Sequence, residues 1–235
     1  GFEYKFLGLL RSDRHLIGVG DSERNQESLV FPLGTDVQGR GLFSRIVYGT
    51  RTSLSIGLVG VTLTLLIGVS LGAVSGYFGG VIDTVIQRSV EIVRAIPTIP
   101  IWLVLAGILP RDWGVLQIYL AITIIISLFA WTDLARVVRG RFLSLREEDF
   151  VTAAMLSGAR WQRIVFRHML PSFYSHLIAA TTLAIPSMII SETALSFLGL
   201  GLRSPAISWG VLLQATQNVH SIALTPWLML PAVPV

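Results

Sequence analysis

The sequence predicts an all-α integral membrane protein built as a polytopic helix bundle. Hydrophobic residues make up 52% of the 235 residues and charged residues only 14%, whereas soluble domains are about 25% charged. The mean hydropathy is +0.69. The chain also contains repeated apolar runs of about 20 residues, the length that a helix needs to cross a bilayer core of about 30 Å. This composition excludes a disordered chain, and the absence of cysteine excludes a disulfide scaffold, a thiolate metal site and a cysteine nucleophile.

The apolar runs predict four complete spans and the start of a fifth. The four are expected at 53–77, 90–109, 115–134 and 173–198, and the fifth begins near Ile222 and continues to Val235. In the first span, Gly68, Gly72 and Gly76 recur every four residues, a spacing that lets a neighbouring helix approach closely. In the second, Pro97 and Pro100 remove backbone hydrogen bonds and predict a bend.

The basic residues set the orientation of these spans. Seven arginines and three acidic residues lie in residues 135–171, a surplus equal to the net charge of +4 of the whole chain. The positive-inside rule places this loop in the cytoplasm, so segment 1–52 is expected outside and 53–235 forms the membrane permease domain. Another span must then precede segment 1–52 to bring the chain across the membrane. We therefore expect a fragment with five spans, taken from a parent protein with six.

Residues 147–171 are too polar to span a membrane and too regularly patterned for a plain loop. Apolar residues fall at helical spacing on both sides of Gly158, and glycine commonly ends a helix. The pattern predicts two short helices that meet at an angle at Gly158. Ala153 and Ala154 on the first helix are small enough for a partner surface to approach closely.

This stretch resembles the EAA loop of bacterial ABC importer permeases. The resemblance rests on Thr152-Ala153-Ala154, Gly158 and Leu170-Pro171. Thr152 replaces the usual glutamate, a substitution familiar in the oligopeptide/dipeptide/nickel branch, and Met169 stands where the pattern has isoleucine. Further stretches that look like this branch, in the expected order, are Leu33-Gly34-Thr35-Asp36, the glycine-rich turn at 76–80, residues 194–201 and Trp209-Gly210.

The resemblance implies a type I ABC importer permease of the second-subunit kind in the bacterial inner membrane. Such a permease pairs with a homologous permease, docks two cytoplasmic ATPases and receives substrate from an extracytoplasmic binding protein. Thr152, Ala153, Ala154, Gly158, Leu170 and Pro171 would couple it to the ATPase. The chain has no G-x-x-x-x-G-K-[ST] motif, so we expect ATP and magnesium on the partners and no cofactor or metal on this chain.

The charged residues within the spans leave several roles open. Glu192 has no basic residue near it in sequence, and it either contacts a cationic substrate group or is satisfied against the partner permease. Glu91 with Arg94, and Asp133 with Arg136, have the i,i+3 spacing of local ion pairs. The substrate class also stays open among peptides, glutathione, oligosaccharides and nickel, with peptides as the main expectation.

Two functions of other classes compete with this interpretation. Residues 68–72 match G-x-S-x-G by letters, so an intramembrane serine hydrolase would use Ser70 with His176. Ser70, however, lies within a predicted helix and lacks the strand-to-helix turn of a nucleophile elbow. A channel or structural subunit would explain the spans but not the helix pair at 147–171.

Overall fold

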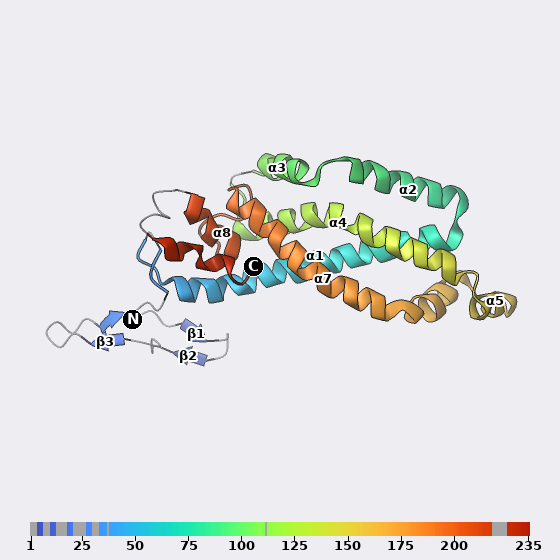
Figure 1. Ribbon diagram of the computed structural model, residues 1–235, viewed down its shortest axis with the longest axis horizontal. Coiled ribbons are helices and arrows are strands. Elements are labelled where there is room, and N and C mark those ends of the chain that lie inside the picture. Colours follow the sequence, from blue (N-terminus) through green and yellow to red (C-terminus); the bar gives the residue numbers. More distant parts are fainter. Residues whose placement is uncertain are drawn as a thin grey trace.

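The computed structural model is a helix bundle preceded by short strands (Figure 1). It describes the backbone of 4–6, 10–12, 18–20 and 27–29, and residues 33–36, 38–110, 112–217 and 225–235. Strand β1 (Tyr4–Phe6) pairs antiparallel with β2 (Leu10–Ser12), and β3 (Gly18–Gly20) pairs antiparallel with β4 (Glu27–Leu29). The all-α prediction therefore holds for the bundle, and the four strands are an addition that the sequence pattern did not predict.

Three helical stretches are long and apolar enough to cross a membrane. They are α1 (Leu42–Phe78), α4 (Val115–Leu145) and a stretch over Trp161–Phe197 whose main part is α7 (Tyr174–Phe197). They contain the predicted spans at 53–77 and 115–134 and nearly all of the one at 173–198. Helix α4 continues to Leu145, so the first part of the predicted basic loop, 135–145, is helical. A helix that carries arginines can extend beyond the hydrocarbon region of the membrane.

The second predicted span is a bent pair of helices. Helix α2 (Gly80–Ala95) and α3 (Thr98–Ile108) meet at 83°. The bend lies at Pro97, as predicted, and Ile96 before it is extended because proline disfavours helical geometry in the preceding residue. Pro100 falls in the first turn of α3, where a missing N–H costs nothing. Between the predicted spans at 53–77 and 90–109 the chain is mostly helical, since α2 begins at Gly80.

The described residues therefore contain three candidate spans, or four if the bent pair counts as one. The predicted fifth span starts among residues outside the described part of the chain. Its later residues, Pro226–Ala232, form a 3-10 helix, η4, that packs against α8 (Trp209–Gln214). Pro231 lies inside this segment and cannot donate the backbone hydrogen bond of an α-helix. The fifth span is not present in the described residues.

Close packing of α1 against α4 forms the centre of the bundle. A Cβ atom added to Gly72 would lie 2.5 Å from the carbonyl oxygen of Ala135, and one on Gly76 would lie 2.5 Å from Cβ of Phe142. A Cβ on Gly68 would lie 3.0 Å from Cβ of Leu134. The three glycines therefore lie against α4, which confirms the prediction that their spacing admits a neighbouring helix.

Candidate functional site

A pair of short helices projects from one end of the bundle, opposite the end that carries α8 (Figure 1). Helix α5 (Asp149–Leu156) ends at Ser157, and α6 (Trp161–Arg163) begins three residues after Gly158. Gly158 has φ +75°, the left-handed conformation that closes many helices. Its N–H donates to the carbonyl of Met155 at 3.0 Å, and the N–H of Ala159 donates to that of Ala154 at 3.1 Å. The predicted break between two helical segments at Gly158 is therefore present. That these segments are coupling helices stays a prediction.

The helix pair is anchored on its inner side by buried apolar residues. Val151 of α5 is fully buried, as are Ile164 and Met169 in the π-helix Ile164–Met169 that follows α6. They pack in one cluster with Val138 and Phe142 of α4. The pair therefore packs directly against α4, one of the membrane-spanning helices.

The outer side of the pair is exposed, and large apolar side chains lie there among charged ones. Thr152, Ala153 and Gly158 are exposed, and Ala154 is half-buried. Exposed large side chains surround them, and Leu156 is 85% exposed. The others are Phe150, Met155, Trp161 and Phe166. We call Thr152, Ala153, Ala154 and Gly158 together with these five large side chains the α5 surface. Of the predicted coupling residues, Leu170 is half-buried and Pro171 begins the 3-10 turn Pro171–Phe173 that leads into α7.

A polar network ties the corner between α1 and α2 to α4 near the same end. The guanidinium of Arg139 donates to both carboxylate oxygens of Asp83, at 2.5 and 2.6 Å. Ser75 donates to Asp83 at 2.5 Å, and Gln87 donates to Ser75 at 3.1 Å. Sequence reasoning missed this network because Asp83 and Arg139 lie in different helices, and no local spacing rule links them.

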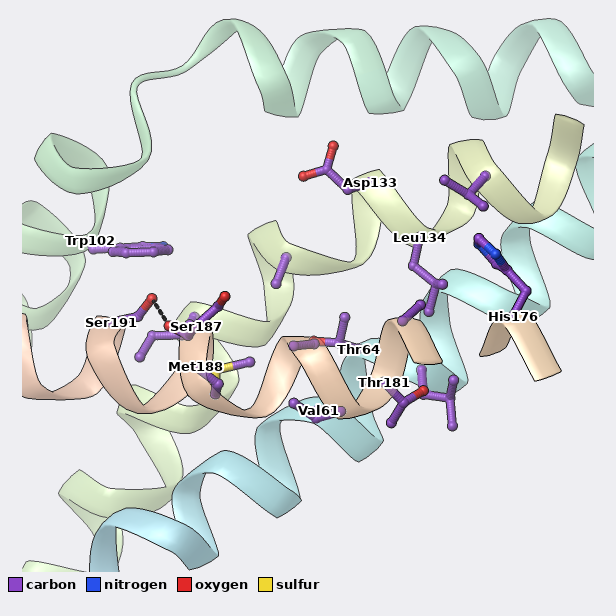
Figure 2. Close-up of a pocket in the computed structure, with 16 residues that line it drawn as sticks. Val61, Thr64, Trp102, Asp133, Leu134, His176, Thr181, Ser187, Met188 and Ser191 are labelled. Carbon is purple, nitrogen blue, oxygen red and sulfur yellow. Dashed lines mark hydrogen bonds between the residues drawn. The ribbon is translucent and has the colours of Figure 1, made fainter. Parts of the chain in front are cut away.

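A cavity of about 330 Å³ opens between α1, α3, α4 and α7 (Figure 2). Its walls are mostly apolar, with a few polar side chains along them. The polar lining residues are Thr64, Trp102, Asp133, His176, Thr181, Ser187 and Ser191. A second cavity of about 300 Å³, between α2, α3 and α4, shares Trp102, Ala130 and Asp133 with the first.

Two ion pairs lie near these cavities, one between helices and one within α2. Arg94 of α2 forms an ion pair with Asp133 of α4, and Glu91 pairs with Arg88 at 2.7 Å. The predicted pairs Glu91–Arg94 and Asp133–Arg136 are therefore wrong. Helix α2 packs against α4 and so brings Arg94 to Asp133, a contact between helices that a local spacing rule does not predict.

Glu192 is fully buried inside this chain, near the α8 end of α7. One carboxylate oxygen accepts hydrogen bonds from Ser196 at 2.7 Å and Ser208 at 3.0 Å, and the other has no partner in the described residues. Ser208 caps the start of α8 by accepting from the N–H of Val211. Glu192 does not line either cavity. Its carboxylate joins α7 to α8, and its place on a substrate pathway stays a prediction.

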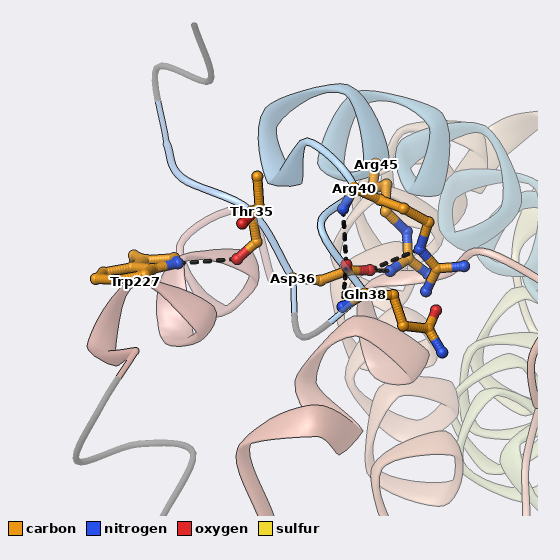
Figure 3. Close-up of polar contacts among 6 residues, drawn as sticks. All are labelled: Thr35, Asp36, Gln38, Arg40, Arg45 and Trp227. Atoms are coloured by element: carbon orange, nitrogen blue, oxygen red, sulfur yellow. Dashed lines mark hydrogen bonds and ion pairs between the residues drawn. The ribbon is translucent and has the colours of Figure 1, made fainter. Parts of the chain in front are cut away.

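A tight turn at the α8 end is organised by one carboxylate (Figure 3). Asp36 accepts from the backbone N–H groups of Gln38 at 2.8 Å and Arg40 at 2.9 Å, and its side chain pairs with Arg40 and Arg45. The indole of Trp227 donates to the carbonyl of Thr35 at 3.0 Å. The turn therefore joins the start of α1 to the 3-10 helix at 226–232.

The Asp36 turn leads to a prediction about stability. Burial raises the pKa of Asp36, but hydrogen bonds from Arg40 and Gln38 outweigh it and hold the pKa below its usual value. A carboxylate whose pKa is lowered in the folded protein stabilises the fold at pH values above its pKa in the unfolded chain, about 3.9. This stabilisation is lost as the pH falls through the pKa of the folded protein. Replacing Asp36 with alanine removes the ion-pair partner of half-buried Arg45 and is expected to cost about 1–3 kcal/mol.

The measurement is thermal unfolding of the detergent-purified protein between pH 7 and pH 3. Asp112→Asn is the matched control, because Asp112 is exposed and makes no ion pair in the described residues. At pH 7 we expect Asp36→Ala to unfold at a lower temperature than the unsubstituted protein. At pH 3 we expect the difference between the two unfolding temperatures to be smaller. An unchanged temperature at pH 7 would show that the turn adds no stability.

The residues of the hydrolase alternative are not brought together in the cavity. Ser70 is exposed on α1 and does not line the cavity that contains His176. The His176 ring stacks on Phe173, with centroids 5.7 Å apart. Ser70 lies in the middle of a continuous helix, so the turn that a nucleophile elbow requires is missing at this position.

Comparison with known proteins identifies a family and several relatives that match this chain. Residues 68–233 match the family described as binding-protein-dependent transport system inner membrane component. An oligopeptide transport system permease of Bacillus subtilis is 36% identical over 85% of this chain and 63% of its own length. A dipeptide transport system permease of Lactococcus lactis is 38% identical over 86% of this chain and 57% of its own length. The chain thus spans roughly three fifths of these relatives.

A solved structure shares the fold. An inward-facing conformation of the MetNI methionine ABC transporter superposes with a TM-score of 0.63 at 20% identity. The match covers 83% of this chain and 91% of that one. At this identity the likeness concerns the arrangement of the helices.

Proposed function

Because this chain belongs to the family of binding-protein-dependent transport system inner membrane components, we propose that it forms one permease half of an ATP-driven peptide importer. The α5 surface is the observation that carries the proposal. It exposes large apolar side chains, and it is anchored through Val151, Ile164 and Met169 to the membrane-spanning helices. A monomer gains nothing from exposing such a surface to water, whereas a docking partner would bury it.

The partner proposed for the α5 surface is a cytoplasmic ATPase. Thr152, Ala153 and Ala154 would contact it, Gly158 would set the angle between the two helices, and Leu170-Pro171 would begin the link to α7. ATP and magnesium bind to the ATPase subunits in this proposal. The energy reaches this chain as a movement of the helix pair, which the buried cluster passes to α4 and α7.

A homologous permease and an extracytoplasmic binding protein complete the proposed assembly. The α5 end faces the cytoplasm, and the Asp36 turn and α8 face outward in the bacterial inner membrane. Six arginines in residues 136–163 support this orientation. Peptides are the proposed substrates because the relatives from Bacillus subtilis and Lactococcus lactis are described as oligopeptide and dipeptide permeases.

Purification of the full-length protein tests the proposal. An affinity-tagged protein expressed with its neighbouring genes is expected to bring down a second permease and an ATPase. The purified complex should hydrolyse ATP faster when peptide-loaded binding protein is added. Solute flux through the purified chain without ATP and without an ATPase would instead support a channel.

A further inference from the structure

A groove of about 700 Å³ runs between the end of α4 and the start of α7, near the α5 end of the bundle. It adjoins the first cavity at His176, which Figure 2 shows at the end of that cavity farthest from Trp102. We call it the basic groove. Its polar side chains are all exposed, so a ligand can reach each of them. They are Arg136, Arg141, Ser144, Ser172, Ser175 and His176.

The positive charge of the basic groove is not neutralised by the protein. Neither Arg136 nor Arg141 forms an ion pair in the part of the chain that the structure describes. No acidic residue is among the described residues that line the groove. Asp133, the partner that sequence spacing predicts for Arg136, pairs with Arg94 instead. The groove therefore favours an anionic ligand.

The hydrogen-bonding groups of the basic groove fit a phosphate. A guanidinium presents its N–H donors in a planar arrangement that matches phosphate oxygens. The His176 imidazole keeps at least one N–H donor in either protonation state. The hydroxyls of Ser144 and Ser175 make no hydrogen bond within the described residues and are free to donate. Helices α4 and α7 thus both direct donors to one site.

Apolar side chains beside the basic groove indicate that the phosphate belongs to a lipid. Helices α4 and α7 lie in stretches that can cross a membrane, and the groove follows the apolar run that ends at Leu134. Val137 in its wall is 45% exposed, and Ile178, one turn beyond Ser175, is 66% exposed. A free phosphate would leave both side chains uncovered, whereas an acyl chain covers them.

We propose that the basic groove binds the headgroup of an anionic phospholipid. The phosphate contacts Arg136 and Arg141, and an acyl chain lies along Val137 and Ile178. Basic pockets between membrane-spanning helices suit such headgroups. A bound lipid joins α4 to α7 beside the buried cluster that anchors α5. This inference goes beyond the proposed function, because it does not depend on what the importer carries.

Native mass spectrometry of the full-length protein, purified with its accompanying subunits, tests the site. The protein is titrated with phosphatidylglycerol, or with phosphatidylcholine that carries the same acyl chains. We expect phosphatidylglycerol to bind more tightly. Arg136→Gln and Arg141→Gln should each raise its apparent Kd roughly fivefold, which corresponds to about 1 kcal/mol for each cation. The double variant should bind the two lipids about equally.

A matched control separates the groove from the general positive charge of this end. Arg163→Gln/Arg167→Gln removes the same charge from exposed side chains that do not line the groove, and its Kd for phosphatidylglycerol should be unchanged. All variants should unfold at the same temperature in lipid-free detergent, because none of these arginines forms an ion pair within the described residues. An equal loss of lipid binding in the control would overturn the site.

Two soluble competitors distinguish a lipid from other anionic ligands. Glycerol 3-phosphate carries the phosphate without an acyl chain, and trialanine carries a peptide carboxylate. We expect neither to displace phosphatidylglycerol at matched concentration. Displacement by glycerol 3-phosphate would make the groove a site for soluble phosphates, and displacement by trialanine would make it a site for peptides. Either result would overturn the lipid proposal.

Thiol labelling measures the same contact in a bilayer, because the chain contains no cysteine. Ser175→Cys places a thiol in the basic groove, and exposed Ser157→Cys is the control outside it. In nanodiscs, uncharged N-ethylmaleimide should label position 175 more slowly with phosphatidylglycerol than with phosphatidylcholine. Adding Arg136→Gln/Arg141→Gln should remove this difference, and position 157 should react equally in both lipids. A rate at 175 that is independent of the lipid would refute the site, whether or not the transporter imports peptides.

Discussion

Replacing Gly158 with arginine is expected to abolish peptide uptake and the ATP hydrolysis that loaded binding protein stimulates. The physical reason is the exposed position of this glycine between α5 and α6. An added Cβ would meet no atom within 4 Å, and the backbone φ is +75°. An arginine side chain would therefore project from the α5 surface without entering the bundle, at a backbone cost of about 1–2 kcal/mol.

Two effects would then weaken the proposed contact with an ATPase. The backbone strain changes the angle between α5 and α6, and the long charged side chain separates an apolar surface from its partner. The buried anchors Val151, Ile164 and Met169 are untouched, so the protein should still insert and pair with its homologous permease. Capture of peptide by the separate binding protein should also be normal.

The assay compares uptake, stimulated ATP hydrolysis and copurification of the ATPase. Gly158→Asn is the matched control, because asparagine tolerates the left-handed conformation and adds little bulk. It is expected to retain most of the activity. Full stimulated hydrolysis and uptake by Gly158→Arg would mean that the α5 surface is not the coupling element, and the importer proposal would lose its main support.

The Gly158 cap was predictable because its signal is local. Helical spacing on both sides and a glycine between them define the turn within a few residues. The apolar runs of α1 and α4 were equally clear, since a run of about 20 apolar residues indicates a membrane-spanning helix. The end of α4 was not predictable in this way. Hydropathy marks where the lipid ends, while the helix itself continues through Arg136 and Arg139 to Leu145.

Other features depend on tertiary contacts that no sequence window contains. Gly79 and Gly80 indicated a loop, but both adopt positive φ and allow α2 to begin directly after α1. Arg94 had a plausible partner in its own helix and pairs instead with Asp133 of α4. Thr64 and Trp102 are ordinary members of apolar runs, and only the packing of α1 and α3 against α4 and α7 places both residues beside one cavity.

Replacing Gly72 with leucine is expected to prevent stable folding, and even Gly72→Ala is expected to lower stability by about 1–3 kcal/mol. A Cβ at this position would lie 2.5 Å from the carbonyl oxygen of Ala135 and 2.7 Å from Cβ of Val138. The carbonyl belongs to the backbone of α4 and cannot move aside as a flexible side chain would. Helix α1 must therefore shift away from α4 along the centre of the bundle.

A control on another helix separates this clash from helix propensity. Alanine favours a helix over glycine by about 1 kcal/mol, so propensity alone predicts that Gly72→Ala stabilises α1. Gly107 in α3 has no atom within 4 Å of an added Cβ, and Gly107→Ala gains that propensity without a clash. Thermal unfolding in detergent and abundance in the membrane are compared for both. If Gly72→Ala proved as stable as Gly107→Ala, the close contact between α1 and α4 would not exist in the folded protein.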